Sequence, residues 1–119
     1  MNQNEAVVAV CTALPEVTAT ITNEGARSNP FALVRIITRY TRKMAAQHNE
    51  LMLEKCLQLV DRVYTQGERA IKNAIENIFI FSLDHILYPC SAGERSRTFS
   101  KVPVTLYTSY VNQVYKSGI

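Results

Sequence analysis

The chain has 119 residues, of which 47% are hydrophobic and 19% are charged, and its net charge is +3 at pH 7. This length predicts one domain over residues 1–119 with a sizeable core, and the composition excludes a disordered protein. No apolar run reaches the roughly 18 residues that a membrane span needs. The small net charge does not favour nucleic acid as a partner.

The first 29 residues predict a helix, a second shorter helix and a loop. Asn2 or Asn4 can cap a helix that runs to about Ala13, and Pro15 disfavours helical geometry at the residue before it. Residues 17–22 alternate apolar residues with threonine, which is the period of a strand. No second strand pattern exists to pair with it, so we favour a short irregular helix.

Two amphipathic helices follow. Pro30 directly after Asn29 is typical of a helix start, and the apolar period continues to about residue 46. A short polar joint at residues 47–49 then leads into a helix over about 49–66. Gly67 follows it in the place of a helix-ending glycine.

The most hydrophobic segment predicts a helix over 68–88. Ile75, Ile78 and Phe79 share its wide apolar face, so we expect all three to be buried. Residues 78–81 (Ile-Phe-Ile-Phe) make the helix apolar on nearly every side. Such a helix belongs in the middle of a bundle.

The remaining residues predict a loop and a last helix. Residues 90–102 have no clear period and are expected to form an irregular loop, mobile at Gly93. Pro103 starts a helix over about 103–116, which Gly118 closes. The predicted fold is therefore all-α, an irregular bundle of about five helices with helix 68–88 central.

Cysteine and histidine usage favours a cytoplasmic protein without a metal or other cofactor. Three cysteines at wide spacing (Cys11, Cys56 and Cys90) indicate reduced thiols in the core. His48 and His85 have no partner at metal-ligand spacing, so we expect them to be structural or exposed rather than ligands. Glu5 precedes the apolar run 6–14, where a secretory signal would carry a basic residue.

Four cations on the helix over 30–46 form what we call the basic stripe: Arg35, Arg39, Arg42 and Lys43. Helical spacing brings them to one side, opposite much of the apolar face. They could be a solvated face that pairs with Glu5, Glu16 or Glu24 of the acidic N-terminal segment, or a site for an acidic protein surface. Nucleic acid is the weakest reading, because no aromatic residues are interleaved to stack bases.

Arg95, Arg97 and Lys101, in the expected loop, could extend the basic stripe.

A second cluster is polar. Asn73, Glu76 and Asn77 fall on one side of the otherwise apolar helix over 68–88, and His85 lies near its end. If that side is covered, these groups need hydrogen-bond partners. They could form a structural network with tyrosine hydroxyls of the last helix, or line a small-ligand or catalytic pocket.

Several of these residues also carry a resemblance. The chain has Gly67, then Lys72–Asn73–Ala74, Glu76–Asn77 and Phe79, and later Leu106–Tyr107 with Tyr110. Over residues 30–119 it resembles an uncharacterised family of small all-helical bacterial proteins. The resemblance implies a helical bundle in a bacterial cytoplasm and implies no activity.

No catalytic or phosphate-loop motif is visible in the sequence. We therefore expect a non-enzymatic helical protein–protein interaction module, an adaptor or immunity-type binder, and the sequence sets no oligomeric state. The alternative is a small-ligand-binding or enzymatic domain with a polar pocket near Asn73, Glu76, Asn77 and His85.

Overall fold

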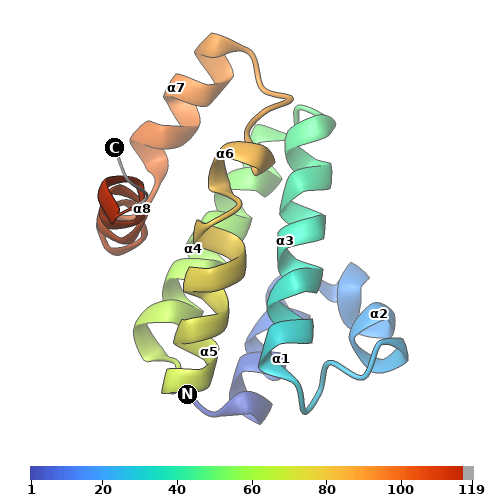
Figure 1. Ribbon diagram of the computed structural model, residues 1–119. Coiled ribbons are helices and arrows are strands. Elements are labelled where there is room, and N and C mark those ends of the chain that lie inside the picture. Colours follow the sequence, from blue (N-terminus) through green and yellow to red (C-terminus); the bar gives the residue numbers. More distant parts are fainter. Residues whose placement is uncertain (117–119) are drawn as a thin grey trace.

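The computed structural model describes residues 1–116, and in that range it is built from helices without a strand. Eight α-helices are joined by short turns, with a 3-10 turn η1 (Pro15–Val17) and a π-helical segment η2 (Ile75–Ile80) (Figure 1). The α-helices are α1 (Gln3–Ala13), α2 (Thr18–Asn23), α3 (Pro30–Ala46), α4 (Glu50–Gln66), α5 (Arg69–Ala74), α6 (Leu83–Ile86), α7 (Ala92–Lys101) and α8 (Val104–Lys116). The all-α class is confirmed, with eight α-helices in residues 1–116 in place of the expected number of about five.

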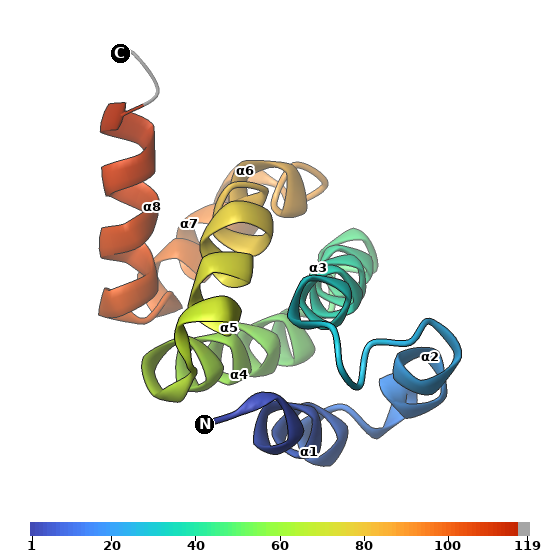
Figure 2. The ribbon, with the colours of Figure 1, turned by 60° about the horizontal axis from the view of Figure 1, so that its bottom comes forward.

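The core lies where α3, α4 and the α5–η2–α6 segment pack side by side (Figure 1). Helix α1 covers one end of α4, while α7 and α8 pack against α4 on the other side. Figure 2 shows α2 and α8 at opposite edges of the molecule. The largest fully buried side chains lie between residues 14 and 86 and include Leu14, Leu33, Leu57 and Phe79. The same buried cluster extends to Leu106 in α8, so one hydrophobic core serves residues 1–116.

The N-terminal half agrees closely with the expected pattern. Asn2 caps α1 through the backbone N–H of Glu5 at 2.9 Å, and the Glu5 carboxylate accepts from the backbone N–H of Asn2 at 3.0 Å. From Pro15 the chain forms η1 and then α2. The expected short irregular helix is therefore confirmed, and the alternating residues 17–22 do not form a strand. Helix α3 begins at Pro30, with the Asn29 side chain accepting from the Ala32 backbone N–H.

The expected continuous helix over 68–88 is interrupted. After α5 the backbone changes to π hydrogen bonding at η2, and α6 resumes only at Leu83. A π turn holds more residues than an α turn, so it rotates the residues after it relative to a continuous α-helix. Ile75 and Phe79 are buried as expected, whereas Ile78 is only half-buried and Phe81 is exposed. The segment still packs against α3, α4 and α8.

The expected irregular loop over 90–102 is wrong, because residues 92–101 form helix α7. Ser91 and Glu94 make a capping box, in which the Ser91 hydroxyl accepts from the Glu94 backbone N–H and the Glu94 carboxylate accepts from the Ser91 backbone N–H. This reciprocal pair satisfies two N–H groups that the first helical turn leaves open. Gly93 lies inside α7, and the expected closing residue Gly118 lies outside the described residues.

Among residues 1–116, no single helix is long and apolar enough to cross a membrane. Only α1 together with the segment Pro15–Asn23 passes by length and composition, and these two are bent by 118° at their junction.

Candidate functional site

The basic stripe lies on the outer side of α3, and all four of its side chains are exposed. Within residues 1–116, only Arg39 has a carboxylate partner: its Nη2 atom lies 2.8 Å from both carboxylate oxygens of Glu24, next to the end of α2. Within the described residues no ion pair reaches Arg35, Arg42 or Lys43. The acidic N-terminal segment therefore pairs with one of the four stripe cations.

Two shallow hollows border the stripe. One, of about 330 Å³, lies between α3 and α2 and is lined by Arg39 and Lys43 together with Glu16 and Glu24. Tyr40 also lines this hollow, and burial together with the neighbouring Glu16 charge raises its pKa to about 12, so its phenol stays protonated. The acidic segment thus flanks the stripe on the α2 side.

The other hollow lies on the η2 side of α3 and has a volume of about 370 Å³. Ala32 and Ile78 supply apolar surface, while Arg35 and Thr38 contribute polar groups to its wall. Apolar surface therefore adjoins the unpaired Arg35 guanidinium.

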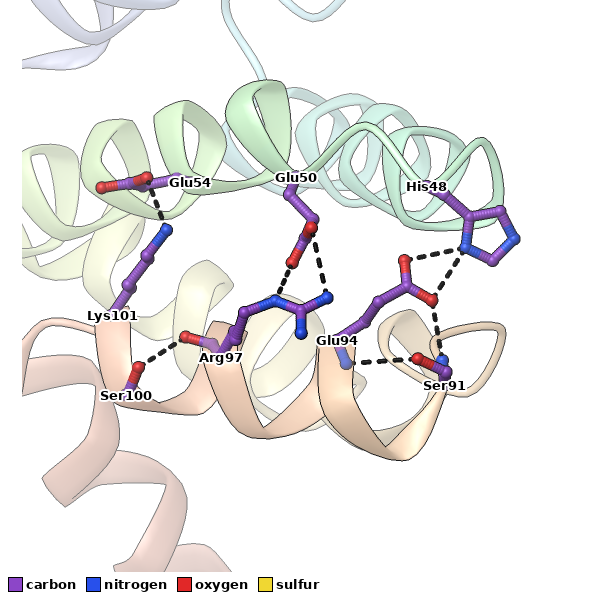
Figure 3. A network of polar contacts seen from close by, with 8 residues as sticks. All are labelled: His48, Glu50, Glu54, Ser91, Glu94, Arg97, Ser100 and Lys101. Carbon is purple, nitrogen blue, oxygen red and sulfur yellow. Dashed lines mark hydrogen bonds and ion pairs between the residues drawn. The ribbon is translucent and has the colours of Figure 1, made fainter.

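Two of the three α7 cations, Arg97 and Lys101, do not extend the stripe, because they belong to a row of ion pairs across α4 and α7, which we call the α4–α7 ladder (Figure 3). Arg95 is exposed and forms no ion pair within residues 1–116. Arg97 Nε lies 2.9 Å from Glu50 Oε1, and Lys101 Nζ lies 3.4 Å from Glu54 Oε2. Glu50 and Glu54 are four residues apart on α4, and so are Arg97 and Lys101 on α7. One helical turn therefore separates the two pairs on each helix, and they lie one above the other.

The third rung of the ladder is His48 with Glu94. His48, at a backbone φ of 58°, places Nδ1 2.8 Å from Glu94 Oε2. The Ser91 backbone N–H and the His48 ring together hold the pKa of Glu94 down to about 2. His48 is therefore a structural residue of the joint between α3 and α4, as expected.

The four residues of the expected polar pocket are not brought together. Asn73, Asn77 and His85 are exposed, and only Glu76 is half-buried. Tyr64 in α4 donates from its hydroxyl to Glu76 Oε1 at 2.6 Å, and Gln113 Nε2 in α8 donates to the Glu76 carbonyl at 2.8 Å. A tyrosine of the last helix does bond this segment, but at Asp84, where the Tyr110 hydroxyl donates at 2.6 Å.

Glu76 instead lines a hollow beside the last helix, which we call the α8 hollow. Its volume is about 450 Å³, and Tyr64 and Glu76 face α8 residues across it. Thr105, Ser109, Asn112 and Lys116 line the α8 side. They recur at steps of four, three and four residues, which places them on one side of the helix. Asn73, Asn77 and His85 are not part of this lining.

Sequence reasoning missed the partners of Glu76. The polar spacing along the last helix was a usable signal, but it did not indicate that this side turns toward Glu76. The contact between Tyr64 and Glu76 joins two helices, and no spacing within one helix predicts it.

In the part of the chain that the structure describes, no group of three or more His, Cys, Asp or Glu side chains could hold a metal ion. Cys11, Cys56 and Cys90 are free thiols. Burial raises the pKa of the Cys56 thiol to about 11, which makes it a poor nucleophile.

A family model described as "Domain of unknown function (DUF7674)" matches residues 9–116. The chain belongs to this family. The DUF7674 match confirms the resemblance and extends it, because it begins within α1, ahead of the residue 30 at which the resemblance began. The basic stripe and the whole α8 hollow lie inside the DUF7674 region. No curated protein and no solved structure matches the chain.

Proposed function

We propose that this chain is a non-enzymatic helical protein–protein interaction module, an adaptor or immunity-type binder, whose basic stripe docks an acidic protein surface. The observation that carries the proposal is the set of three exposed stripe cations that no carboxylate pairs within residues 1–116. An acidic surface would supply the missing counter-charges. Such complementarity speeds association and selects the partner.

The surroundings of the stripe support the same reading. Arginine beside apolar surface is typical of protein interfaces, and Arg35 borders the hollow that Ala32 and Ile78 line. Arg39 is already held by Glu24, so Arg35, Arg42 and Lys43 are the residues that a partner would engage.

We also infer a bacterial cytoplasmic setting. The three free thiols support the cytoplasm, because reduced cysteines are typical of reducing compartments, and the bacterial origin rests on the resemblance alone. The alternative function is a small-ligand-binding or enzymatic domain. Of the four pocket residues expected for it, Glu76 lines the α8 hollow.

The test is a charge reversal of the two stripe arginines that have no ion pair, Arg35→Glu with Arg42→Glu. The matched control is Lys55→Glu with Arg62→Glu, which reverses two exposed cations on α4 at the same seven-residue spacing. Both variants change the net charge equally. Exposed charges contribute about 0–1 kcal/mol each, so both should melt close to the parent.

Affinity capture from nuclease-treated extract of the native host, at low and high salt, then compares the three proteins. We expect the parent and the control to capture the same acidic protein and the stripe variant to lose it. Capture should weaken with salt, because exposed charges are screened over about 10 Å at 0.1 M. Equal capture by the stripe variant and the parent, or equal loss in the stripe variant and the control, would contradict the proposal.

A further inference from the structure

The α8 hollow has the size and lining of a small-molecule site and takes no part in the basic stripe. Its volume of about 450 Å³ lies within the usual range of ligand pockets, roughly 300–1,000 Å³. Hydroxyl and amide side chains of α8, from Thr105, Ser109 and Asn112, line it together with the Tyr64 phenol. The hollow therefore offers several groups that can either donate or accept hydrogen bonds.

Glu76 is held in a fixed position at this hollow. The Tyr64 hydroxyl fixes Oε1, and Gln113 holds the backbone carbonyl of the same residue. Its backbone belongs to η2, and π-helical turns frequently occur at functional sites. No hydrogen bond or ion pair from residues 1–116 reaches Oε2, so one carboxylate oxygen can still accept from a ligand.

The Tyr64 phenol is a donor rather than a base in this arrangement. Burial and the hydrogen bond to Glu76 raise its pKa, while the neighbouring Ser109 hydroxyl acts in the opposite direction. Tyr64 therefore keeps its proton and continues to orient the carboxylate.

Lys116 brings the opposite charge to the same hollow. Its side chain is exposed, and it forms no ion pair with Glu76 or with any other carboxylate in the described part of the chain. The lining thus presents one carboxylate and one ammonium group that do not neutralise each other. A ligand with both charges would satisfy the two groups at once.

We propose that the α8 hollow binds a small zwitterion, a free amino acid or a very short peptide, whose ammonium group contacts Glu76 and whose carboxylate contacts Lys116. The α8 hydroxyl and amide groups would bond the ligand between these two ends. A neutral sugar would also fit such groups, but it would form weaker bonds to both charged ends, since charge-assisted hydrogen bonds are about twice as strong as neutral ones.

The experiment titrates the full chain with individual free amino acids and monitors the backbone NMR signals of Ser109 and Asn112. The tightest ligand is then compared with its N-acetyl derivative, which lacks the ammonium group, and its methyl ester, which lacks the carboxylate. We expect each derivative to bind about tenfold more weakly or worse, because a hydrogen bond to a charged group contributes about 1.5–3 kcal/mol.

Two variants assign the charges. Glu76→Gln keeps an acceptor for Tyr64 and should weaken the amino acid about tenfold, but not its N-acetyl derivative. Lys116→Gln should weaken the amino acid but not its methyl ester. The controls are Glu68→Gln and Lys72→Gln, at exposed positions outside the lining. They should change the affinity for neither the amino acid nor its derivatives.

Several results would overturn the proposal. They are no signal shift with any amino acid, derivatives that bind as tightly as the parent ligand, or equal losses in Glu76→Gln and Glu68→Gln. If Glu76→Gln fails to fold, Lys116→Gln and the two derivatives still decide, because they need no change at η2. None of these measurements involves α3, so a failure here and a failure of the stripe proposal are separate results.

Discussion

Phe79 and Phe81 are two residues apart and have opposite environments. Phe79 is 1% exposed and Phe81 is 75% exposed. The sequence places both in the same apolar run, but residues two apart on a helix point to nearly opposite sides, so only one of the two can face the core. Within η2, Phe79 is held in the core with Ile75 and Ile80, and Phe81 follows this segment on the outward side.

Phe79→Ala should therefore lower the free energy of unfolding by about 3–5 kcal/mol, through lost burial and a cavity. Phe81→Ala removes the same atoms from an exposed position and should change it by no more than about 0.5 kcal/mol. Urea denaturation monitored by circular dichroism measures both. Similar losses in the two variants would mean that Phe79 is not the core residue of this segment.

At the scale of the element, the position of α7 is set by its N-terminal capping box and its ion pairs more than by buried apolar side chains. Thr98 is the single buried residue within α7, and the α4–α7 ladder lines the contact with α4 (Figure 3). The capping box fixes where the helix begins, and the ladder fixes which side meets α4.

Glu94→Gln tests the charge of the third rung while preserving the cap, because glutamine also serves in a capping box. Glu94 has a folded pKa of about 2 against an ordinary value of 4.5, so its contribution is present above 4.5 and is lost as pH falls toward 2. The parent should therefore be more stable than the variant near pH 6, and the difference should vanish near pH 2. Thermal melts of both proteins across this range are the measurement. Equal stability of the two proteins near pH 6 would show that Glu94 acts only as a cap.

Elements with strong periodicity could be predicted from the sequence, and the contacts between them could not. Asn29–Pro30 and a regular apolar face were enough for α3, whose bounds agree with the prediction. Helix α7 was missed because its few apolar residues hide the period, although Ser91 and Glu94 carry the capping signal. The η2 segment lies within a continuous helical path, so no break in composition marks it.

The candidate sites show the same division. The basic stripe could be predicted, because all its residues lie on one helix and one spacing relates them. The α8 hollow could not, because Tyr64, Glu76 and Lys116 come from three elements that meet only through packing. Glu76 was singled out by its polar character on an apolar helix, and its neighbours Asn73 and Asn77 shared that character without sharing its position.

At the scale of the whole molecule, one core connects all of these features. The radius of gyration is 13.6 Å, close to the roughly 13.5 Å expected for one compact domain of this length. The stripe and the α8 hollow lie on different sides of that core, on α3 and α8 (Figure 2). Helices α3 and α4 form the most extensive contact between elements of the core. Separation of these two helices should therefore accompany global unfolding.

Cys56 can report that separation. It is a fully buried α4 residue, and burial raises its thiol pKa to about 11, so the native thiol should not react at pH 7. Unfolding returns the thiol to an ordinary pKa of about 8.5 and exposes it. In a Cys11→Ser, Cys90→Ser variant, labelling of Cys56 should therefore have the same denaturant midpoint as the loss of helical circular dichroism, since a single domain unfolds as one unit. Labelling at a lower denaturant concentration would mean that α4 separates from the core before the remaining helices unfold. The free state of the cysteines has a simpler test. Thiol titration of the unaltered chain under denaturant should find three reactive thiols per chain, and a smaller number would mean that a cysteine is oxidised or otherwise blocked.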